Sequence, residues 1–327
     1  MVLTDSPAFA VGMMLAGLAA GMTWYGFRLK KHQMPVRTAL LAAVLGSMLA
    51  LVCAKAGYLL HDLGNTLFEG YFDDVFSLKA ETLSFAGGCA GFAAGVILAG
   101  RMDGIRPMKA LDLFTVPGCV MICLARIAEG GLGSIGLGNA VEDGWIRFFP
   151  LTMEDSWGDA YLSVFVLEAL TALVCLAAAL RFRKNPDNRE GILFEKTAVC
   201  LIGAQIGWEM LLQYPYARTF LISFISLEQV LWAMILLIVE IRRSRKNGSA
   251  CPAVRTVLLY GLSAFFQFFR DKPYLFTRYL PEAAEAWLQE RMDAVSLIVF
   301  VLISACLILA GLRGAARPER TRILTEK

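Results

Sequence analysis

The chain has 327 residues, of which 57% are hydrophobic and only 18% are charged, and its formal net charge is +3. Soluble domains are typically about 45–50% apolar and about 25% charged. The composition therefore excludes a soluble globular enzyme, a coiled coil and a disordered protein, and it predicts an all-α, polytopic helical membrane protein.

About nine apolar stretches follow one another, and each is long enough to cross a bilayer core of about 30 Å. Basic residues follow the first stretch rather than precede it, which is the reverse of a secretory signal peptide. We therefore expect the first stretch to stay as a membrane anchor. The predicted spans are 9–27, 38–60, 83–100, 110–127, 160–181, 193–213, 220–241, 254–270 and 294–313.

The loops between these spans alternate in charge. The odd-numbered loops and the tail are basic, as with Arg181 and Arg183 in the fifth loop, whereas the second and fourth loops are acidic, as with Asp73 and Glu142. Cytoplasmic loops carry an excess of Lys and Arg. We expect the N-terminus to lie outside and the C-terminus to lie in the cytoplasm, in a multi-pass membrane protein.

Ionisable and polar residues lie within or at the ends of several spans, where they usually face a bundle interior or an aqueous cavity. With the predicted orientation they gather at the outer end, which favours a polar cavity that binds a phospholipid head group through Arg and Lys. Two alternatives stay open, namely snorkelling ends and structural ion pairs between helices. These residues are Lys55, Tyr58, His61, Arg126, Glu168, Glu209, Glu228, Gln229, Gln267 and Arg270.

The cysteines and the glycine-rich segment give weaker signals. All eight cysteines except Cys251 fall in apolar stretches, and their spacing predicts packing rather than a metal site. The glycines after Glu129, at Gly131, Gly133 and Gly136, follow a membrane span and are not a dinucleotide motif. They form either an anion-binding backbone segment beside Arg126 or a flexible external loop. We expect no metal, no cofactor and no nucleic-acid partner.

Taken together, the order of motifs resembles the prolipoprotein diacylglyceryl transferases of bacterial plasma membranes. AKAGYLL resembles that family's A-R-x-G-Y-x-L, with Lys55 in place of its Arg, and the long fourth-span motif places Asp112 and Arg126 at the family's separation. The similar segments occur in the family's order within residues 9–241. They are AKAGYLL (54–60), ETLSFAGG (81–88), ALDLFTVPGCVMICLARIAE (110–129), VLEAL (166–170) and SLEQVL (226–231).

The resemblance implies a function. Such enzymes move the diacylglyceryl group of phosphatidylglycerol onto the lipobox cysteine thiol of secreted preproteins, so the nucleophile belongs to the substrate. Arg126 and Lys55 would stabilise the departing phosphate, while Glu168 and Glu209 orient them. The resemblance also implies a seven-helix transferase-like core over 1–241. The two further spans, which form a hairpin with a basic tail over 242–327, depart from the family, which normally has about seven spans. The remaining expected head-group residues are Tyr58, Glu129, Gly131, Gly133, Gln229 and Arg270.

Several residues depart from the family pattern. The family's His is Ala86 here and its Asn is Glu129, and the segment 260–273 resembles the family's arginine-rich sixth helix better than the sixth span does. His61 is a candidate replacement for the missing base. Two other functions are therefore open: an inactive relative that binds phospholipid or a lipoprotein precursor, and a small-solute transporter, for which intramembrane charge is equally expected.

Overall fold

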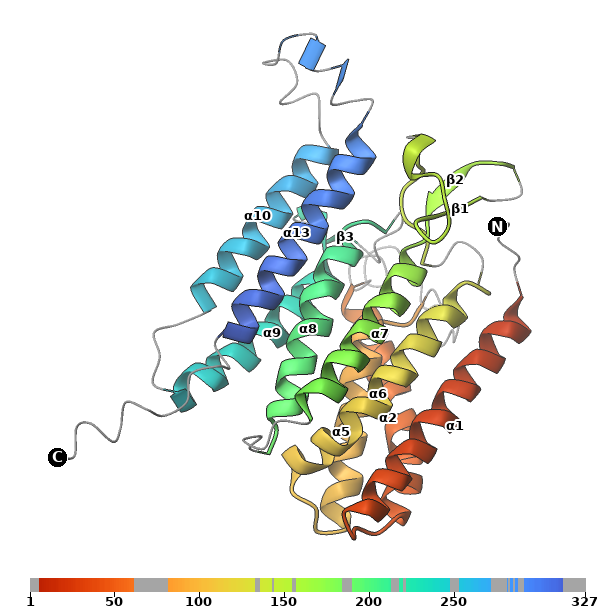
Figure 1. Cartoon of the computed structure of the whole chain (residues 1–327), viewed down its shortest axis with the longest axis vertical. Coiled ribbons are helices and arrows are strands. Elements are labelled where there is room, and N and C mark those ends of the chain that lie inside the picture. Colours follow the sequence, from red (N-terminus) through yellow and green to blue (C-terminus); the bar gives the residue numbers. More distant parts are fainter. Residues whose placement is uncertain are drawn as a thin grey trace, which may run out of the picture.

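The computed structural model is mostly helical (Figure 1). It describes residues 6–61, 82–132, 136–142, 144–154, 157–183, 190–212, 218–219, 222–247, 253–271, 281, 283–284, 286–287 and 291–313. Each predicted span overlaps a helix in this part of the chain. The helices are α1 (Pro7–Lys31), α2 (Arg37–His61), α5 (Phe85–Met102), α6 (Pro107–Glu129), α7 (Val164–Phe182), α8 (Ile192–Glu209), α9 (Leu227–Asn247), α10 (Ala253–Asp271) and α13 (Met292–Arg313).

Six helices in the described residues are long and apolar enough to cross a membrane, namely α1, α2, α5, α6, α7 and α13. The apolar part of α10, Thr256–Phe268, is shorter. Large apolar side chains also point outward, since Leu40, Val174 and Leu258 are 72%, 69% and 66% exposed. These features support a multi-pass membrane protein. The count of nine spans and the orientation stay predictions.

Two small antiparallel sheets interrupt the helical pattern. β1 (Thr152–Glu154) pairs with β2 (Ala160–Leu162), and this hairpin covers the end of the bundle where α6 ends and α7 begins (Figure 1). β3 (Arg218–Thr219) pairs with β4 (Ile222–Ser226). The predicted start of the 220–241 span was therefore wrong, because α9 begins only at Leu227. The β4 sequence ISFIS is rich in β-branched and aromatic residues, which favour strands.

Glycines spaced four residues apart let α2 and α5 pack closely. A Cβ added at Gly91 would lie 2.2 Å from the Leu49 carbonyl oxygen, and one added at Gly95 would lie 2.4 Å from Gly46 Cα. A side chain at either position would collide with backbone. Small residues at this spacing are typical of close helix packing in membranes.

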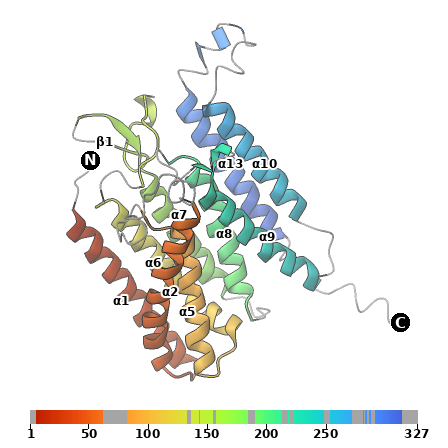
Figure 2. The same cartoon turned by 180° about the vertical axis from the view of Figure 1, so that it is seen from behind.

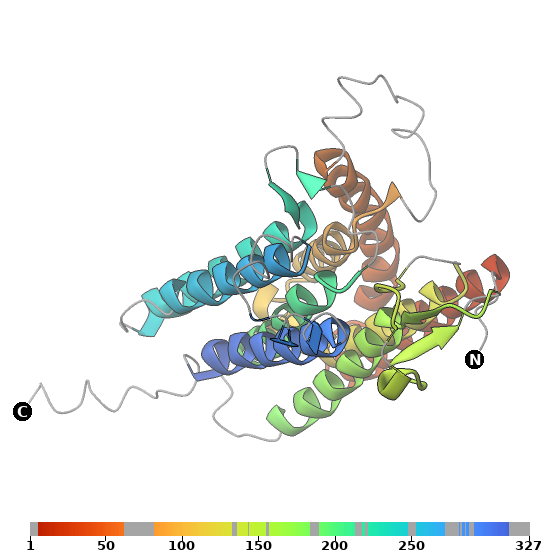
Figure 3. The same ribbon diagram turned by 90° about the horizontal axis from the view of Figure 1, so that it is seen from above.

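Glycines four residues apart also let α13 pack closely against α8, although the two helices are far apart in the sequence. A Cβ at Gly203 would lie 2.9 Å from Ile308 Cγ1, and one at Gly207 would collide with the Ser304 hydroxyl. Figure 2 shows α13 beside α8. Seen from above, α10 and α13 lie on one side of the molecule and α1 and α2 on the other (Figure 3). The division of the chain at residue 241 stays a prediction.

The buried apolar side chains form two main groups. One lies between α1, α2, α5 and α6 and includes Tyr25 and Phe114, and the other surrounds α8, α9 and α13 and includes Ile206 and Phe300. A cavity of about 450 Å³ lies where these groups meet, because Phe92 and Phe114 line it from the first and Ile202 and Trp232 from the second. This cavity leads to the candidate site.

Candidate functional site

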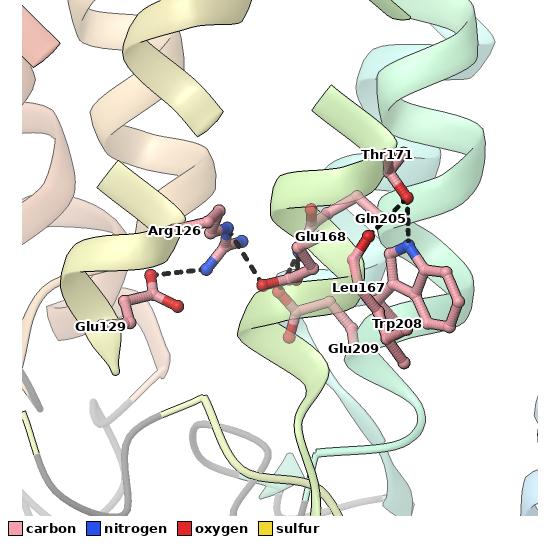
Figure 4. A network of polar contacts seen from close by, with 8 residues as sticks. All are labelled: Arg126, Glu129, Leu167, Glu168, Thr171, Gln205, Trp208 and Glu209. Carbon is pink, nitrogen blue, oxygen red and sulfur yellow. Dashed lines mark hydrogen bonds and ion pairs between the residues drawn. The ribbon is translucent and has the colours of Figure 1, made fainter. Parts of the chain in front are cut away.

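The centre of the site is Arg126, in the last turn of α6. The residue is only 5% exposed. Its guanidinium carbon lies 3.6 Å from the centre of the Phe85 ring, which is a cation–π arrangement. Arg126 Nη1 lies 2.6 Å from Glu129 Oε1 on the same helix, and Nε lies 3.1 Å from Glu168 Oε2 on α7 (Figure 4). Two carboxylates thus hold one buried cation.

Gln205 on α8 joins a third carboxylate to this cluster. Its Nε2 donates to Glu168 Oε1 at 2.5 Å and to Glu209 Oε1 at 3.0 Å (Figure 4). Gln205 and Glu209 are four residues apart, so both side chains lie on one face of α8. Glu168 and Glu209 are buried, at 3% and 2% exposed. Three helices therefore contribute to one polar layer.

A neighbouring contact holds α8 in register with α7. Trp208 Nε1 donates to Thr171 Oγ1 at 3.0 Å, and the Thr171 hydroxyl donates to the Leu167 carbonyl oxygen at 2.9 Å (Figure 4). This contact lies one turn from Glu168 along α7. It keeps Gln205 within reach of Glu168.

The charges of the cluster are unequal. Three carboxyl groups, those of Glu129, Glu168 and Glu209, surround the guanidinium of Arg126. Arg126 Nη2 is buried and has no hydrogen-bond partner among the residues that the structure describes. A bound anion would find a donor there, but it would also meet more negative than positive charge. Entry of an anion therefore favours displacement or protonation of a carboxylate.

The cavity beside this cluster is largely apolar. Side chains from α1, α5, α6, α8 and α9 line it, including Leu18, Phe92, Ile122 and Ile235. Gln205 lines the cavity and also donates to Glu168, so the polar cluster borders the cavity on one side. The sequence predicts a polar cavity instead. The difference arises because the charged side chains pair with one another rather than line an open space.

Two other segments of the motif series meet near Phe85. Lys55 Nζ on α2 donates to the Thr82 carbonyl oxygen at 3.4 Å and lies 5.0 Å from the centre of the Tyr58 ring. Ser84 accepts a hydrogen bond from Gly87 N at 3.1 Å and caps α5. Lys55 thereby holds the segment that presents Phe85 to Arg126.

Ala86 lies at the position where the family that the motifs resemble has a histidine. It is 1% exposed and lines the apolar cavity beside Phe85, whose ring contacts Arg126. The motif positions of α2, α5 and α6 are therefore neighbours in space. A methyl group at position 86 supplies no base.

The glycine-rich segment lies partly against α1. The Gly131 carbonyl oxygen accepts a hydrogen bond from Ser6 N at 2.9 Å, so Gly131 contacts the start of α1 rather than the guanidinium. Gly136 has φ +79°, and a Cβ added there would lie 3.1 Å from Glu129 Oε2. The Gly136 backbone therefore lies beside the Glu129 carboxylate. Gly133 lies outside the described residues.

The structure leaves four of the predicted polar residues without a described side chain. The backbone of His61 belongs to α2, those of Glu228 and Gln229 belong to α9, and that of Arg270 belongs to α10. Their side chains lie outside the described part of the structure. Their roles stay predictions.

Sequence reasoning missed two members of the site, Gln205 and Phe85. Gln205 had a usable signal, because it is a polar residue one helical turn before Glu209 in an otherwise apolar stretch. Phe85 had no distinctive signal, since an aromatic residue at a helix start is ordinary.

Comparison with models of known protein families and with curated proteins finds no match for this chain. The family resemblance therefore rests on the sequence motifs and stays a prediction.

Proposed function

We propose that this protein transfers the diacylglyceryl group of phosphatidylglycerol to the lipobox cysteine of preproteins, at the outer leaflet of a bacterial plasma membrane. The observation that carries the proposal is the guanidinium of Arg126, which is buried next to an apolar cavity and whose Nη2 has no hydrogen-bond partner among the residues that the structure describes. A phospholipid needs this combination of a phosphate-binding cation and an apolar space for its chain. The ordered series of motifs supplies the second support.

In the proposed complex the lipid phosphate binds Arg126 and an acyl chain enters the cavity of about 450 Å³. Trp232 lines this cavity, and its Nε1–H is buried without a hydrogen-bond partner among the described residues. An ester carbonyl of the lipid would accept from it. Buried donors nearly always have a partner. An ester carbonyl of a lipid bound in this position would be the partner of the Trp232 N–H group.

Glu129 is the acid best placed to respond to the phosphate. Its side chain is 14% exposed, compared with 2% for Glu168. Glu168 is held from two sides, by Arg126 and by Gln205. The phosphate therefore displaces Glu129 from Arg126, and the freed carboxylate faces the incoming thiol.

The proposed chemical step is a displacement at carbon. The Glu129 carboxylate takes the proton of the substrate thiol, and the sulfur forms a bond to the terminal glyceryl carbon. The bond between that carbon and the phosphate oxygen breaks, and glycerol phosphate leaves with the electron pair. Arg126 stabilises the developing charge on the phosphate, and Lys55 supports the segment that carries Phe85. The thiol must reach thiolate character in the transition state, which is the task of Glu129.

The test uses the purified full-length protein in phosphatidylglycerol nanodiscs with a lipobox peptide. We expect mass spectrometry to detect a diacylglyceryl mass addition on the peptide cysteine, and we expect none with Arg126→Met. A peptide with Ser in place of the lipobox Cys is the matched substrate control. Failure of the wild-type protein to modify the Cys peptide, under conditions in which an authentic transferase does so, would refute the transferase function.

A second candidate is a lipid-binding protein without turnover, and Ala86 and Glu129 favour it. Ala86 removes the family's histidine from the cavity wall, and Glu129 neutralises the arginine that would hold phosphate. Such a protein would bind phosphatidylglycerol through Arg126 without forming the thioether. The same nanodisc experiment separates the two candidates, because lipid retention and peptide modification are measured together.

A further inference from the structure

A second buried arginine lies at the other end of the bundle. Arg28, in the last turn of α1, is 8% exposed, and Tyr25, one turn earlier, is fully buried at 0%. The Tyr25 ring packs edge-on against Phe114 of α6, with ring centres 5.6 Å apart. Residues three apart lie on one helix face, so the Tyr25 hydroxyl and the Arg28 guanidinium both face the interior near α6.

Both side chains present a donor that lacks an acceptor. Tyr25 Oη and Arg28 Nη1 are buried and have no hydrogen-bond partner among the described residues. Buried polar groups in proteins nearly always have a partner, and an unmet donor is costly. Two unmet donors one turn apart indicate a shared acceptor that the protein itself does not supply.

The acid whose charge acts on Arg28 already accepts other hydrogen bonds. Asp112 on α6 accepts from Gly191 N at 2.5 Å and from Phe194 N at 2.8 Å, and it thereby fixes the start of α8. Its charge acts on Arg28. Each Asp112 oxygen accepts from one of these backbone donors, and neither oxygen is a hydrogen-bond partner of Arg28 Nη1 in the described residues.

The surroundings of Arg28 are strongly positive. His32 follows α1, and burial together with the positive charges of Arg28, Lys109, Arg183 and Lys31 lowers its pKa. These cations come from α1, from α6 and from the end of α7. An added anion would be attracted by all of them.

We propose that Tyr25 and Arg28 bind a phosphate group at this end of the bundle. A phosphate offers several acceptor oxygens to the two unmet donors, and arginine suits it in charge and geometry. Asp112 and Arg126 are about 21 Å apart along α6, so this site is separate from the Arg126 cluster. The phosphate belongs either to an anionic lipid in the bilayer leaflet at the Arg28 end of the bundle or to a soluble phosphate compound.

The lipid source is tested by native mass spectrometry of the full chain released from phosphatidylcholine nanodiscs that contain phosphatidic acid. We expect the wild-type protein to retain one phosphatidic acid more than Arg28→Met, and we expect Tyr25→Phe, which removes only the hydroxyl, to bind it about tenfold more weakly. Lys30→Met is the matched control, because Lys30 is exposed on the same turn of α1, and it should behave as wild type. Arg126→Met should also keep this lipid.

The soluble source is tested by titrating delipidated protein in detergent with inorganic phosphate, using the same variants and isothermal calorimetry. Loss of binding in Tyr25→Phe and Arg28→Met but not in Lys30→Met, for either probe, supports the site and identifies the source. Equal retention of both probes by the wild type and the Tyr25→Phe variant overturns the proposal. An equal loss in Lys30→Met also overturns it, because general surface charge then accounts for the binding.

Discussion

The two ends of the helix bundle handle buried arginine in opposite ways. At one end, Arg126 lies among three carboxyl groups and two of them form ion pairs with it. At the other end, Arg28 lies among further cations, and its Nη1 has no hydrogen-bond partner in the described residues. An ion pair at that end joins Asp103 to Arg37, whose side chain is 73% exposed.

This contrast shows that the counter-charges on neighbouring helices decide what a buried arginine can do. At the acid-rich end, around Arg126, a carboxylate can take up a proton, and Arg126 can bind a ligand only when a carboxylate moves away from it. At the base-rich end, around Arg28, an anion is attracted without displacement of a carboxylate. A formal net charge of +3 for the whole chain conceals both environments.

The largest effect is expected for Arg126→Met. It leaves Glu168 buried at 3% exposed without its cation. Loss of one partner of a buried ion pair costs about 3–5 kcal/mol. We expect a large fall in the melting temperature in detergent, measured by differential scanning fluorimetry. Arg101→Met is the control, because Arg101 is exposed at the opposite end, and it should melt as wild type.

A combined variant separates stability from function at this end. Arg126→Met with Glu129→Gln and Glu168→Gln also removes the two carboxylates that form ion pairs with Arg126. We expect this variant to recover much of the lost stability and to stay inactive. If Arg126→Met alone melts with the Arg101→Met control, the acid-rich cluster does not stabilise the bundle.

The next effect is expected for Glu129→Gln, which keeps an acceptor near Arg126 but removes one negative charge. Anionic lipid then binds more tightly, because it no longer competes with a carboxylate. Turnover falls about 100-fold, because an amide cannot take the thiol proton. Lipid affinity and peptide modification in nanodiscs measure both changes. Glu154→Gln, on the exposed side of β1, should change neither, and unchanged turnover in Glu129→Gln would remove this residue from the proton transfer.

A moderate effect is expected for Gln205→Leu. The substitution removes the donor shared by Glu168 and Glu209. Loss of one hydrogen-bond donor to a buried carboxylate costs about 1–3 kcal/mol, so the melting temperature should fall. Thr171→Val is the comparison, because it removes the acceptor of Trp208 and touches no carboxylate. A smaller loss in Gln205→Leu than in Thr171→Val would show that the bridge contributes little.

The smallest effect is expected for Asp103→Asn at the base-rich end. The hydrogen bond from Thr38 lowers the pKa of Asp103, and Arg37 acts in the same direction. A lowered folded-state pKa stabilises the protein above the unfolded value of about 3.9 and loses that contribution as the pH falls through the folded value. The variant should therefore melt slightly below wild type at pH 7, and the difference should vanish at lower pH. A difference that grows on acidification would contradict this assignment.

Parts of this arrangement could be predicted from the sequence. Arg126, Glu168 and Glu209 are predicted to lie at one end because successive spans reverse direction, and the structure brings them together. Hydropathy located the helices well because a span needs a long apolar run. It could not show that the charges pair with one another, since pairing depends on helix rotation about each axis.

Other features left too little signal along the chain. The β1–β2 hairpin has strands of three residues, which are too short for an alternating pattern to be recognised. The glycines at 87, 91 and 95 do repeat at a packing interval, so close packing of α5 could have been predicted, but the partner helix could not. The unmet donors of Tyr25 and Arg28 arise only from tertiary burial.

The most direct measurement is a cryo-electron microscopy structure of the full-length protein in phosphatidylglycerol nanodiscs. We predict a lipid phosphate within hydrogen-bond distance of Arg126 Nη2, Glu129 turned away from the guanidinium, and an acyl chain in the cavity between Phe92 and Trp232. A cavity without an acyl chain, together with Arg126 still paired to both Glu129 and Glu168 in lipid-saturated discs, would contradict the lipid site.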